Sequence, residues 1–217
     1  MAYAVKEIFY SLQGEGAQVG RPAVFCRFAG CNLWSGLERD RAAAVCQFCD
    51  TDFVGTDGSD GGIFESAEEL AEAVFLRWPK SEAALALTHV RPFVICTGGE
   101  PLLQLDEPAI AALHSRGLQV AVETNGTRSV PAGIDWLCVS PKASAELVVH
   151  SGDELKLIYP QPGAEPERYA DLDFAHFFLQ PMDGPALEEN TRQAVVYCLS
   201  YPRWRLSLQT HKLLGLR

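Results

Sequence analysis

Several features that define other protein classes are missing from this sequence of 217 residues. No apolar run approaches the ~20 residues that a membrane-spanning helix needs. The residues after Met1 lack the basic and then apolar regions of a secretory signal peptide, so we expect a cytoplasmic protein. Basic residues are few: 18 Lys and Arg stand against 28 Asp and Glu, a net charge of −10, which argues against a nucleic-acid backbone as direct ligand.

The chain also lacks an internal repeat and a linker that would divide it. Hydrophobic residues make up 47% and charged residues 21%, as in ordinary globular proteins. The length suffices for one sizeable core and is short for two. We therefore predict a single domain over residues 1–217.

Strands and helices alternate along most of the chain. The expected strands are mostly continuous apolar runs, as in parallel strands covered on both faces: Ala23–Phe28, Phe93–Thr97, Gln119–Glu123, Trp136–Ser140, Glu154–Tyr159, His176–Leu179 and Arg203–Leu208. This alternation predicts an α/β fold with a mostly parallel sheet.

Three segments carry helix signals. Ser66 and Glu69 form a capping box before Leu70–Trp78, and Asp106 or Glu107 begins a helix that ends at Gly117. The third helix presents one apolar face, made of Leu187, Thr191, Ala194, Val195, Cys198 and Leu199. A complete eight-fold barrel usually needs ~250 residues, so we predict a partial, TIM-like β/α barrel.

The seven cysteines fall into two groups. Cys26, Cys96, Cys138 and Cys198 lie inside apolar runs and are expected to be small buried hydrophobes. Cys31, Cys46 and Cys49 follow the first expected strand and are separated by 14 and two residues. In α/β sheets, ligands bind beyond the carboxyl ends of strands, so these three are placed for a site.

Three thiolates permit two kinds of metal centre. A structural zinc site would need a fourth ligand, for which His89 and His114 are available. A [4Fe–4S] cluster with three cysteine ligands would instead leave one iron open for an exogenous ligand. The segment Thr97-Gly-Gly-Glu-Pro101 follows another buried strand, where adjacent glycines allow close approach to a ligand, although a plain turn has the same composition.

Taken together, these motifs resemble those of the radical S-adenosylmethionine superfamily, and within it the 7-carboxy-7-deazaguanine synthase family. The family's members with a long insertion in the cluster loop are similar to this chain, whose loop 31–49 contains an inserted segment 32–45. The matching stretches, in order, are residues 7–16, 25–34, 46–52, 97–101, 123–126, 140–142, 180–183 and 209–212.

The resemblance implies a lyase that converts 6-carboxy-5,6,7,8-tetrahydropterin to 7-carboxy-7-deazaguanine with loss of ammonia, on the route to queuosine. It implies a [4Fe–4S] cluster on Cys31, Cys46 and Cys49, S-adenosylmethionine as cofactor, Mg²⁺ at Thr51, a homodimer, and flavodoxin or ferredoxin as electron donor. The cofactor would contact Phe48, Cys49, Asp50, Gly99, Glu100, Ser140, Pro141, Lys142, Gln180, Pro181, Met182 and Asp183, with Gly99 and Glu100 near the methionine amino group. The substrate would contact Leu12, Gln13, Gly14, Glu15, Arg27, Thr97, Glu123, His211 and Arg217.

Two of these residues have competing interpretations. Arg27 lies in an apolar run, so it either points outward on an alternating strand or meets a buried anion; the resemblance favours the substrate carboxylate. The segment ending at Arg217 either frays or folds over the site, and we hypothesise that its terminal carboxylate meets the pterin's amino groups.

Two other functions share part of the pattern. A radical activase for a glycyl-radical partner would have the same cluster and Gly-Gly-Glu-Pro segment, but a three-residue first cysteine gap and no need of Thr51 or Arg27. A zinc-stabilised binding module would bind one zinc ion, stay colourless and tolerate loss of Glu100.

Overall fold

The computed structural model describes residues 2–79 and 91–217. Within those residues nine strands form one sheet, in the order β3-β1-β2-β4-β5-β6-β7-β8-β9. Their bounds are β1 Tyr3–Leu12, β2 Pro22–Phe28, β3 Gly62–Phe64, β4 Phe93–Gly98, β5 Gln119–Thr124, β6 Trp136–Val139, β7 Ser151–Tyr159, β8 Asp173–Pro181 and β9 Trp204–Leu206.

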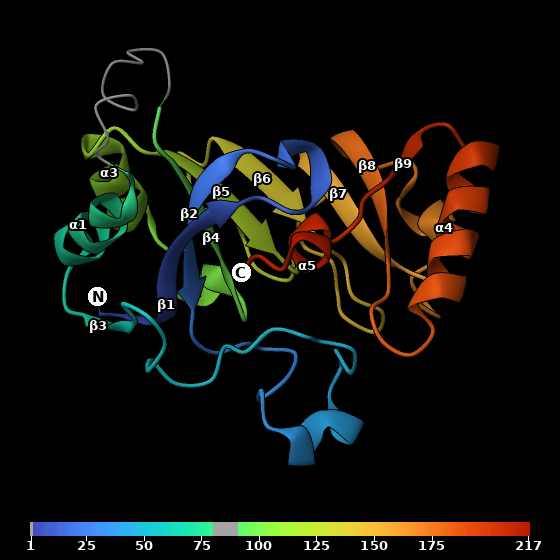
Figure 1. Cartoon of the computed structure of the whole chain (residues 1–217), viewed down its shortest axis with the longest axis horizontal. Helices are drawn as coiled ribbons and strands as arrows, with labels where there is room; N and C mark the ends of the chain where they lie inside the picture. The colour runs from blue at the N-terminus through green and yellow to red at the C-terminus, as the bar shows by residue number, and fades with distance from the viewer. Residues whose placement is uncertain (1, 80–90) are drawn as a thin grey trace.

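From β2 to β9 every neighbouring pair of strands is parallel, whereas β1 pairs antiparallel with both β2 and β3. The sheet curves without closing (Figure 1). The predicted partial TIM-like barrel with a mostly parallel sheet is therefore confirmed. All seven expected strands are present, with ends that differ by a few residues.

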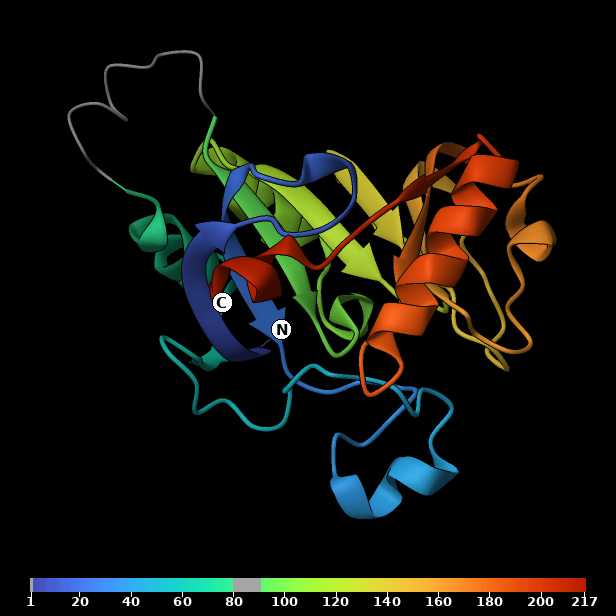
Figure 2. The same cartoon turned by 45° about the vertical axis from the view of Figure 1, so that its right-hand side comes forward.

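The helices lie on the outer face of the sheet at its two sides (Figure 1). Helices α1 (Ala67–Arg77) and α3 (Glu107–Ser115) pack on each other and on β1 and β5, and α4 (Leu187–Ser200) packs on β8 and β9. Helix α5 (Thr210–Leu214) lies across the opposite, concave face (Figure 2). The 3₁₀ turns are η1 Gly16–Gln18, η2 Glu38–Ala43, η3 Pro101–Leu103 and η4 Pro166–Tyr169.

The expected helix starts are confirmed. The Ser66 side chain accepts a hydrogen bond from the Glu69 N–H, and the Asp106 carboxylate accepts one from the Ala109 N–H. None of the helices in the described ranges is long and apolar enough to cross a membrane. His89 lies outside the described residues.

The predicted face of α4 is wrong in part. Ala194 is buried, but Leu187 is 42% exposed and Leu199 is 79% exposed. The helix instead buries Asn190, whose side-chain amide donates to the Met182 carbonyl oxygen at 2.8 Å. A polar residue anchors this helix, so the spacing of the apolar residues alone does not predict which face is buried.

Strands β1 and β3 were not predicted. The pairing of β1 with β2 shifts register between Val5 and Glu7, so an irregularity interrupts the alternation of buried and exposed residues. Strand β3 has only three residues. Neither strand shows the long apolar run that marks the parallel strands.

Candidate active site

A cavity of about 350 Å³ lies on the concave side of the sheet, at the carboxyl ends of the parallel strands. The alternation of side chains explains its lining, because residues two apart point to the same face. On β2, β4 and β5 the outward face of the sheet packs in the main core, while Phe25, Ile95 and Ala121 form a small apolar cluster on the concave face.

Two residues beyond each of those apolar side chains stand Arg27, Thr97 and Glu123, which line the cavity. Strands β7 and β8 add Lys156 and Gln180 by the same rule. The parallel sheet thus supplies an apolar base with a polar rim above it. This arrangement is typical of active sites at the carboxyl ends of barrel strands.

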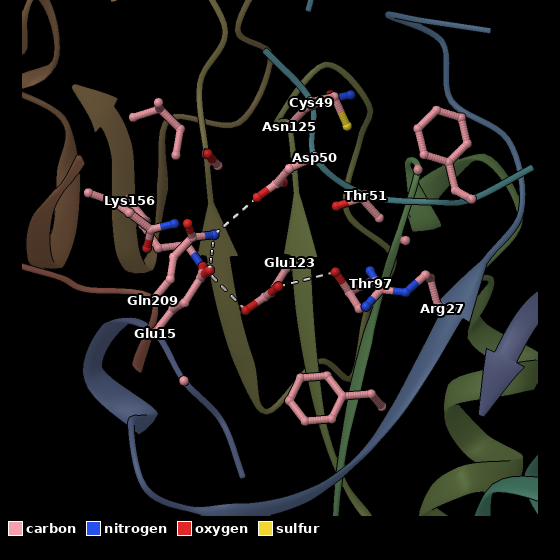
Figure 3. A pocket seen from close by; sticks show the side chains of 18 of the residues that line it. Glu15, Arg27, Cys49, Asp50, Thr51, Thr97, Glu123, Asn125, Lys156 and Gln209 are labelled. Carbon is pink, nitrogen blue, oxygen red and sulfur yellow. Dashed lines mark hydrogen bonds and ion pairs between the residues drawn. The ribbon is translucent and has the colours of Figure 1, made fainter. Parts of the chain in front are cut away.

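A chain of hydrogen bonds and ion pairs crosses the cavity (Figure 3). The Lys156 ammonium donates to Glu15 Oε2 at 2.5 Å and lies 3.4 Å from Glu123 Oε1. Glu123 also accepts from the Thr97 hydroxyl at 3.1 Å and from the Gln13 amide at 2.9 Å. One ammonium and two carboxylates are therefore linked in a largely buried place.

Burial and neighbouring charges act in opposite directions on the pKa values of Glu15 and Lys156. Burial alone would raise the pKa of Glu15, but the Lys156 ammonium and hydrogen bonds from neighbouring amides outweigh it and lower the pKa to about 2. Burial would lower the pKa of Lys156, and Glu123 and Glu15 raise it well above its usual value. Both groups are charged at neutral pH.

The loop after β1 closes one wall of the cavity. The Gly14 carbonyl oxygen accepts from the Thr210 N–H at 3.0 Å and from the Thr210 hydroxyl at 2.9 Å. A Cβ at Gly14 would lie 2.2 Å from His211 Nδ1, so only glycine permits this approach. The Gln209 amide donates to Glu15 at 3.0 Å and to Asp50 at 3.3 Å, so α5 also joins the cluster loop.

The three predicted cluster cysteines line the same cavity. Cys31 Sγ accepts a hydrogen bond from the Leu33 N–H at 3.4 Å, and the Thr51 N–H donates to Cys49. A hydrogen bond between the Cys46 and Cys49 thiols lowers the pKa of Cys49 to about 6 and raises that of Cys46. Burial raises the pKa of Cys31.

Backbone N–H groups directed at cysteine sulfurs are the hydrogen bonds that tune iron–sulfur clusters, so the donor set fits such a group. All seven cysteines are free thiols. Within residues 2–79 and 91–217, no three Cys, His, Asp or Glu side chains are close enough to hold one metal ion. His114, considered as a fourth zinc ligand, lies on α3 against Asp135 at 2.9 Å and does not line the cavity.

The inserted segment 32–45 is coil with the short turn η2, and it projects from the body of the molecule (Figure 1). Part of it packs: the Trp34 ring is 7% exposed and meets the Phe53 ring edge-on at 5.6 Å. Arg41 lies over Trp34 at 4.1 Å and donates to the carbonyl oxygens of Gln47 and Cys49. The insertion thereby holds the two later cysteines.

The turn after β4 runs directly beneath the first cysteine. Gly98 has a φ of +126°, which side chains rarely adopt, and a Cβ at Gly99 would lie 2.0 Å from the Gly30 carbonyl oxygen. Glu100 was expected to lie near the methionine amino group of the cofactor. Its carboxylate is instead 0% exposed and does not line the cavity. It accepts hydrogen bonds from the Thr124 hydroxyl and the Asn125 N–H, both at 2.8 Å, and burial raises its pKa.

The segments after β6 and β8 carry the other predicted cofactor residues. Lys142 is half-buried and donates to the Ser140 carbonyl and hydroxyl oxygens, both at 2.7 Å, and desolvation lowers its pKa. Asp183 is tied to Asp50 through Lys212, whose ammonium lies 2.6 and 2.5 Å from the two carboxylates. Pro141 and Met182, also predicted, do not line the cavity.

Arg27 points into the cavity, which excludes the outward orientation. Its Nε donates to Glu7 Oε1 at 3.0 Å, and the Arg217 guanidinium binds the other oxygen of Glu7 at 2.6 Å. The segment ending at Arg217 therefore folds over the site, and the Arg217 carbonyl oxygen accepts from the Ser11 hydroxyl at 3.0 Å.

The remaining predicted residues all line the cavity. With those above they are Leu12, Gln13, Gly14, Glu15, Phe48, Thr51, Thr97, Gly99, Glu123, Gln180, Pro181 and His211. Six lining residues that take part in the polar contacts described above were not predicted: Glu7, Thr124, Asn125, Lys156, Gln209 and Lys212. Lys156 had a signal, because it stands between Leu155 and Leu157 in an apolar run, as Arg27 does.

Of the expected buried cysteines, Cys26, Cys96 and Cys138 are at most 2% exposed, whereas Cys198 is only half-buried. Cys138 differs from the other two because it faces the cavity. Burial raises its pKa well above the usual thiol value.

Comparison with known proteins gives two kinds of relative. A 7-carboxy-7-deazaguanine synthase from Caulobacter vibrioides is 64% identical over 216 residues, and one from Bordetella pertussis is 61% identical over 216 residues; each match covers 100% of both chains. The crystal structure of QueE from Escherichia coli matches with a TM-score of 0.68 at 27% identity, covering 96% of this chain and 94% of that one. No family model matches the sequence.

Proposed function

Because this chain belongs to the 7-carboxy-7-deazaguanine synthase family, we propose that its strand-end cavity is where 6-carboxy-5,6,7,8-tetrahydropterin becomes 7-carboxy-7-deazaguanine with loss of ammonia. The chain is a radical S-adenosylmethionine lyase of the queuosine pathway. The observation that carries the assignment of the site is that the three cysteines line the same cavity as Arg27, Thr97 and Glu123.

Cys31, Cys46 and Cys49 are proposed to hold a [4Fe–4S] cluster whose fourth iron binds S-adenosylmethionine. When bound, these groups supply the 5′-deoxyadenosyl radical that removes a hydrogen atom from C6 of the pterin. The chain's own contribution is to hold the three thiolates with N–H donors at their sulfurs and to cover them with the insertion.

The proposed cofactor residues come from three parts of the chain. Phe48 and Asp50 belong to the cluster loop, Gly99 to the turn after β4, and Ser140, Lys142, Gln180, Pro181 and Asp183 to the ends of β6 and β8. Glu100, which lies behind this wall, supports it by holding the end of β5 through Thr124 and Asn125. We assign Pro141 and Met182 to backbone support of the same wall.

The substrate is proposed to lie between the loop after β1 and the ends of β2, β4 and β5. Arg27 uses Nε for Glu7, which leaves the terminal nitrogens of its guanidinium for the substrate carboxylate. The Thr51 hydroxyl faces the same space and would provide an oxygen ligand for Mg²⁺. Leu12, Gln13, Gly14, Glu15, Thr97, Glu123, His211 and Arg217 complete the proposed substrate site.

Three further expectations belong to this proposal. The chain works as one domain, pairs as a homodimer, and receives its electron from a low-potential protein such as flavodoxin or ferredoxin. Close positioning of C6 against the radical decides the reaction, since a rigid site restricts which hydrogen atom is within reach.

Anaerobic reconstitution followed by mass analysis of products tests the proposal. We expect a brown protein that, with S-adenosylmethionine, reductant and the carboxytetrahydropterin, forms 7-carboxy-7-deazaguanine, ammonia and 5′-deoxyadenosine. A matched sample with the Cys31→Ala variant should form none of them. A colourless zinc protein, or a cluster protein that cleaves S-adenosylmethionine but leaves the pterin intact, would contradict it.

A further inference from the structure

Lys156 is a buried ammonium on β7 at the centre of the cavity, with a side chain that is 6% exposed. It stands between Glu15, from the loop after β1, and Glu123, from the end of β5 (Figure 3). None of the motifs in the sequence includes it. Burying an ammonium costs free energy unless neighbouring groups compensate its charge, and here the two carboxylates do so.

The hydrogen bonds leave each carboxylate with acceptor capacity. An ionised carboxylate offers about four lone-pair positions. Glu123 uses three, for Gln13, Thr97 and Lys156. Glu15 likewise uses three, for Lys156, Gln209 and Gln180. One acceptor position on each therefore remains for a ligand in the cavity.

Both acceptors depend on the one cation. Two carboxylates that share a buried site without a counter-charge cannot both stay ionised, and one takes up a proton. The other charged or titratable groups acting on Lys156 are Glu154, Cys138 and Lys142. Glu154 accepts from the Ala17 N–H at 2.7 Å, the Cys138 thiol is neutral, and Lys142 is bound to Ser140. None of these replaces the ion pair with Lys156.

We propose that Lys156 is a positioning residue that keeps Glu15 and Glu123 ionised together as a pair of hydrogen-bond acceptors, and that this pair selects the reduced pterin over its oxidised form. The inference rests on the proposed function, since it names how the same site chooses its substrate.

The chemistry of the two pterins gives the reason. The tetrahydropterin ring carries N–H groups at positions 5 and 8, which donate hydrogen bonds. In the fully oxidised ring both nitrogens present lone pairs, which an ionised carboxylate repels. A site with two ionised acceptors therefore binds the first and rejects the second, because mismatched polar groups are left unpaired.

The test is equilibrium binding to the anaerobically reconstituted enzyme with S-adenosylmethionine and no reductant, so that no turnover occurs. The two probes are 6-carboxy-5,6,7,8-tetrahydropterin and oxidised 6-carboxypterin, each titrated from pH 6 to pH 9. The variants are Lys156→Gln, Lys156→Arg and the double variant Lys156→Gln/Glu15→Gln. Arg192→Gln is the control, since Arg192 pairs with Glu189 at 2.8 Å on the exposed surface of α4.

For the wild type, Lys156→Arg and the control we expect a preference for the reduced pterin of about tenfold or more at every pH, the worth of one charge-assisted hydrogen bond. In Lys156→Gln two like-charged carboxylates remain without a counter-charge, so at the acid end of the titration one of them takes up a proton and can donate to the oxidised ring. The preference should fall to about twofold there and recover as the pH rises and the proton is lost. Comparison with the wild type at each pH cancels titration of the pterins themselves.

The double variant restores charge balance, because one carboxylate remains without a like-charged neighbour. Its preference should be independent of pH, and this variant carries the test if Lys156→Gln alone fails to fold. A Lys156→Gln enzyme with the wild-type preference, or with a loss of affinity that is equal for both pterins at every pH, would overturn the inference. Wild-type enzyme that lacks a cluster or binds neither pterin would instead overturn the proposed function.

Discussion

The two walls of the cavity are built in different ways. On the strand-end wall, Glu123 on β5 and Lys156 on β7 stand on strands of one hydrogen-bonded sheet, and their side chains are 3.4 Å apart. On the cluster-loop wall, Cys31, Cys46 and Cys49 stand on coil that is held mainly by contacts within the loop, such as those of Arg41 with the Gln47 and Cys49 carbonyl oxygens.

The two walls therefore differ in what stabilises them: side-chain contacts within the protein for the first, and the proposed cluster for the second. The strand-end wall is held by ion pairs and hydrogen bonds between its own side chains. The cysteine wall gathers three thiols around one space, and a cluster bonded to all three would cross-link the loop. The first wall should therefore tolerate removal of the cluster, and the second should not.

Removal of a proposed cluster ligand should have the largest effect and tests whether the two walls are stabilised independently. Cys31→Ala should lose the cluster and all detectable product formation, because the open-iron cluster needs three thiolates. Its sheet should persist, so the thermal unfolding of the variant should resemble that of the cluster-free wild type. Iron and sulfide analysis, visible absorbance and a thermal melt by circular dichroism measure these effects.

Cys198→Ser is the matched control, since Cys198 is half-buried on α4 outside the cavity. It should keep the iron content and product yield of the wild type. If Cys31→Ala unfolded the sheet along with the loop, the two walls would not be separable.

A pair of aromatic truncations compares the walls by stability. Phe28→Ala, at a 0% exposed position of β2, should lower the free energy of global unfolding by about 3–5 kcal/mol. Trp34→Ala removes a ring of the insertion and should lower it by less than about 1 kcal/mol, because the loop can open while the sheet stays folded. Hydrogen exchange should nevertheless accelerate in residues 30–53.

Chemical denaturation of cluster-free protein provides the two free energies. Equal losses for the Phe28 and Trp34 variants would mean that the insertion unfolds with the core, in contradiction to the proposed independence of the loop.

The smallest effect concerns Lys212, which joins the walls through Asp50 of the loop and Asp183 after β8. Because the Lys212 side chain is 40% exposed, Lys212→Gln should cost about 0–1 kcal/mol at low ionic strength and less at high ionic strength. The Lys212 ammonium lowers the pKa of Asp183 from 3.8, so this contribution is present above pH 3.8 and disappears as the pH falls below it. Thermal melts of the wild type and Lys212→Gln across pH and salt concentration measure this contribution. A stability difference that grew as the pH fell below 3.8 would contradict the prediction.

The same contrast explains what the sequence could predict. The parallel strands were found because their apolar runs are continuous, and the three cysteines that follow the first of these runs then placed the site. Strand β1 was missed because its register shift near Val5 interrupts the alternation. The packed face of α4 was misjudged because a polar residue, Asn190, anchors it.

Within the site, spacing and position picked out the three cysteines as candidate metal ligands, whereas the resemblance to a known family favoured an iron–sulfur cluster and supplied the cofactor and substrate contacts. Contacts between remote segments could not be predicted: Lys156 meets Glu15 across 141 positions, and Gln209 meets Glu15 across 194. Glu100 shows the limit of a motif, since its place in the sequence does not reveal that its carboxylate faces Thr124 behind the cavity.

The contact of Gly14 with Thr210 and His211 has a consequence for how the enzyme is made. Synthesis proceeds from the N-terminus, and early parts of a chain begin to fold while later parts are still being added. The wall formed by the loop after β1 therefore waits for residues translated some two hundred codons later. The proposed iron–sulfur cluster would therefore enter a complete pocket only after this segment has been translated, and a chain stalled before it would lack this wall of the cavity.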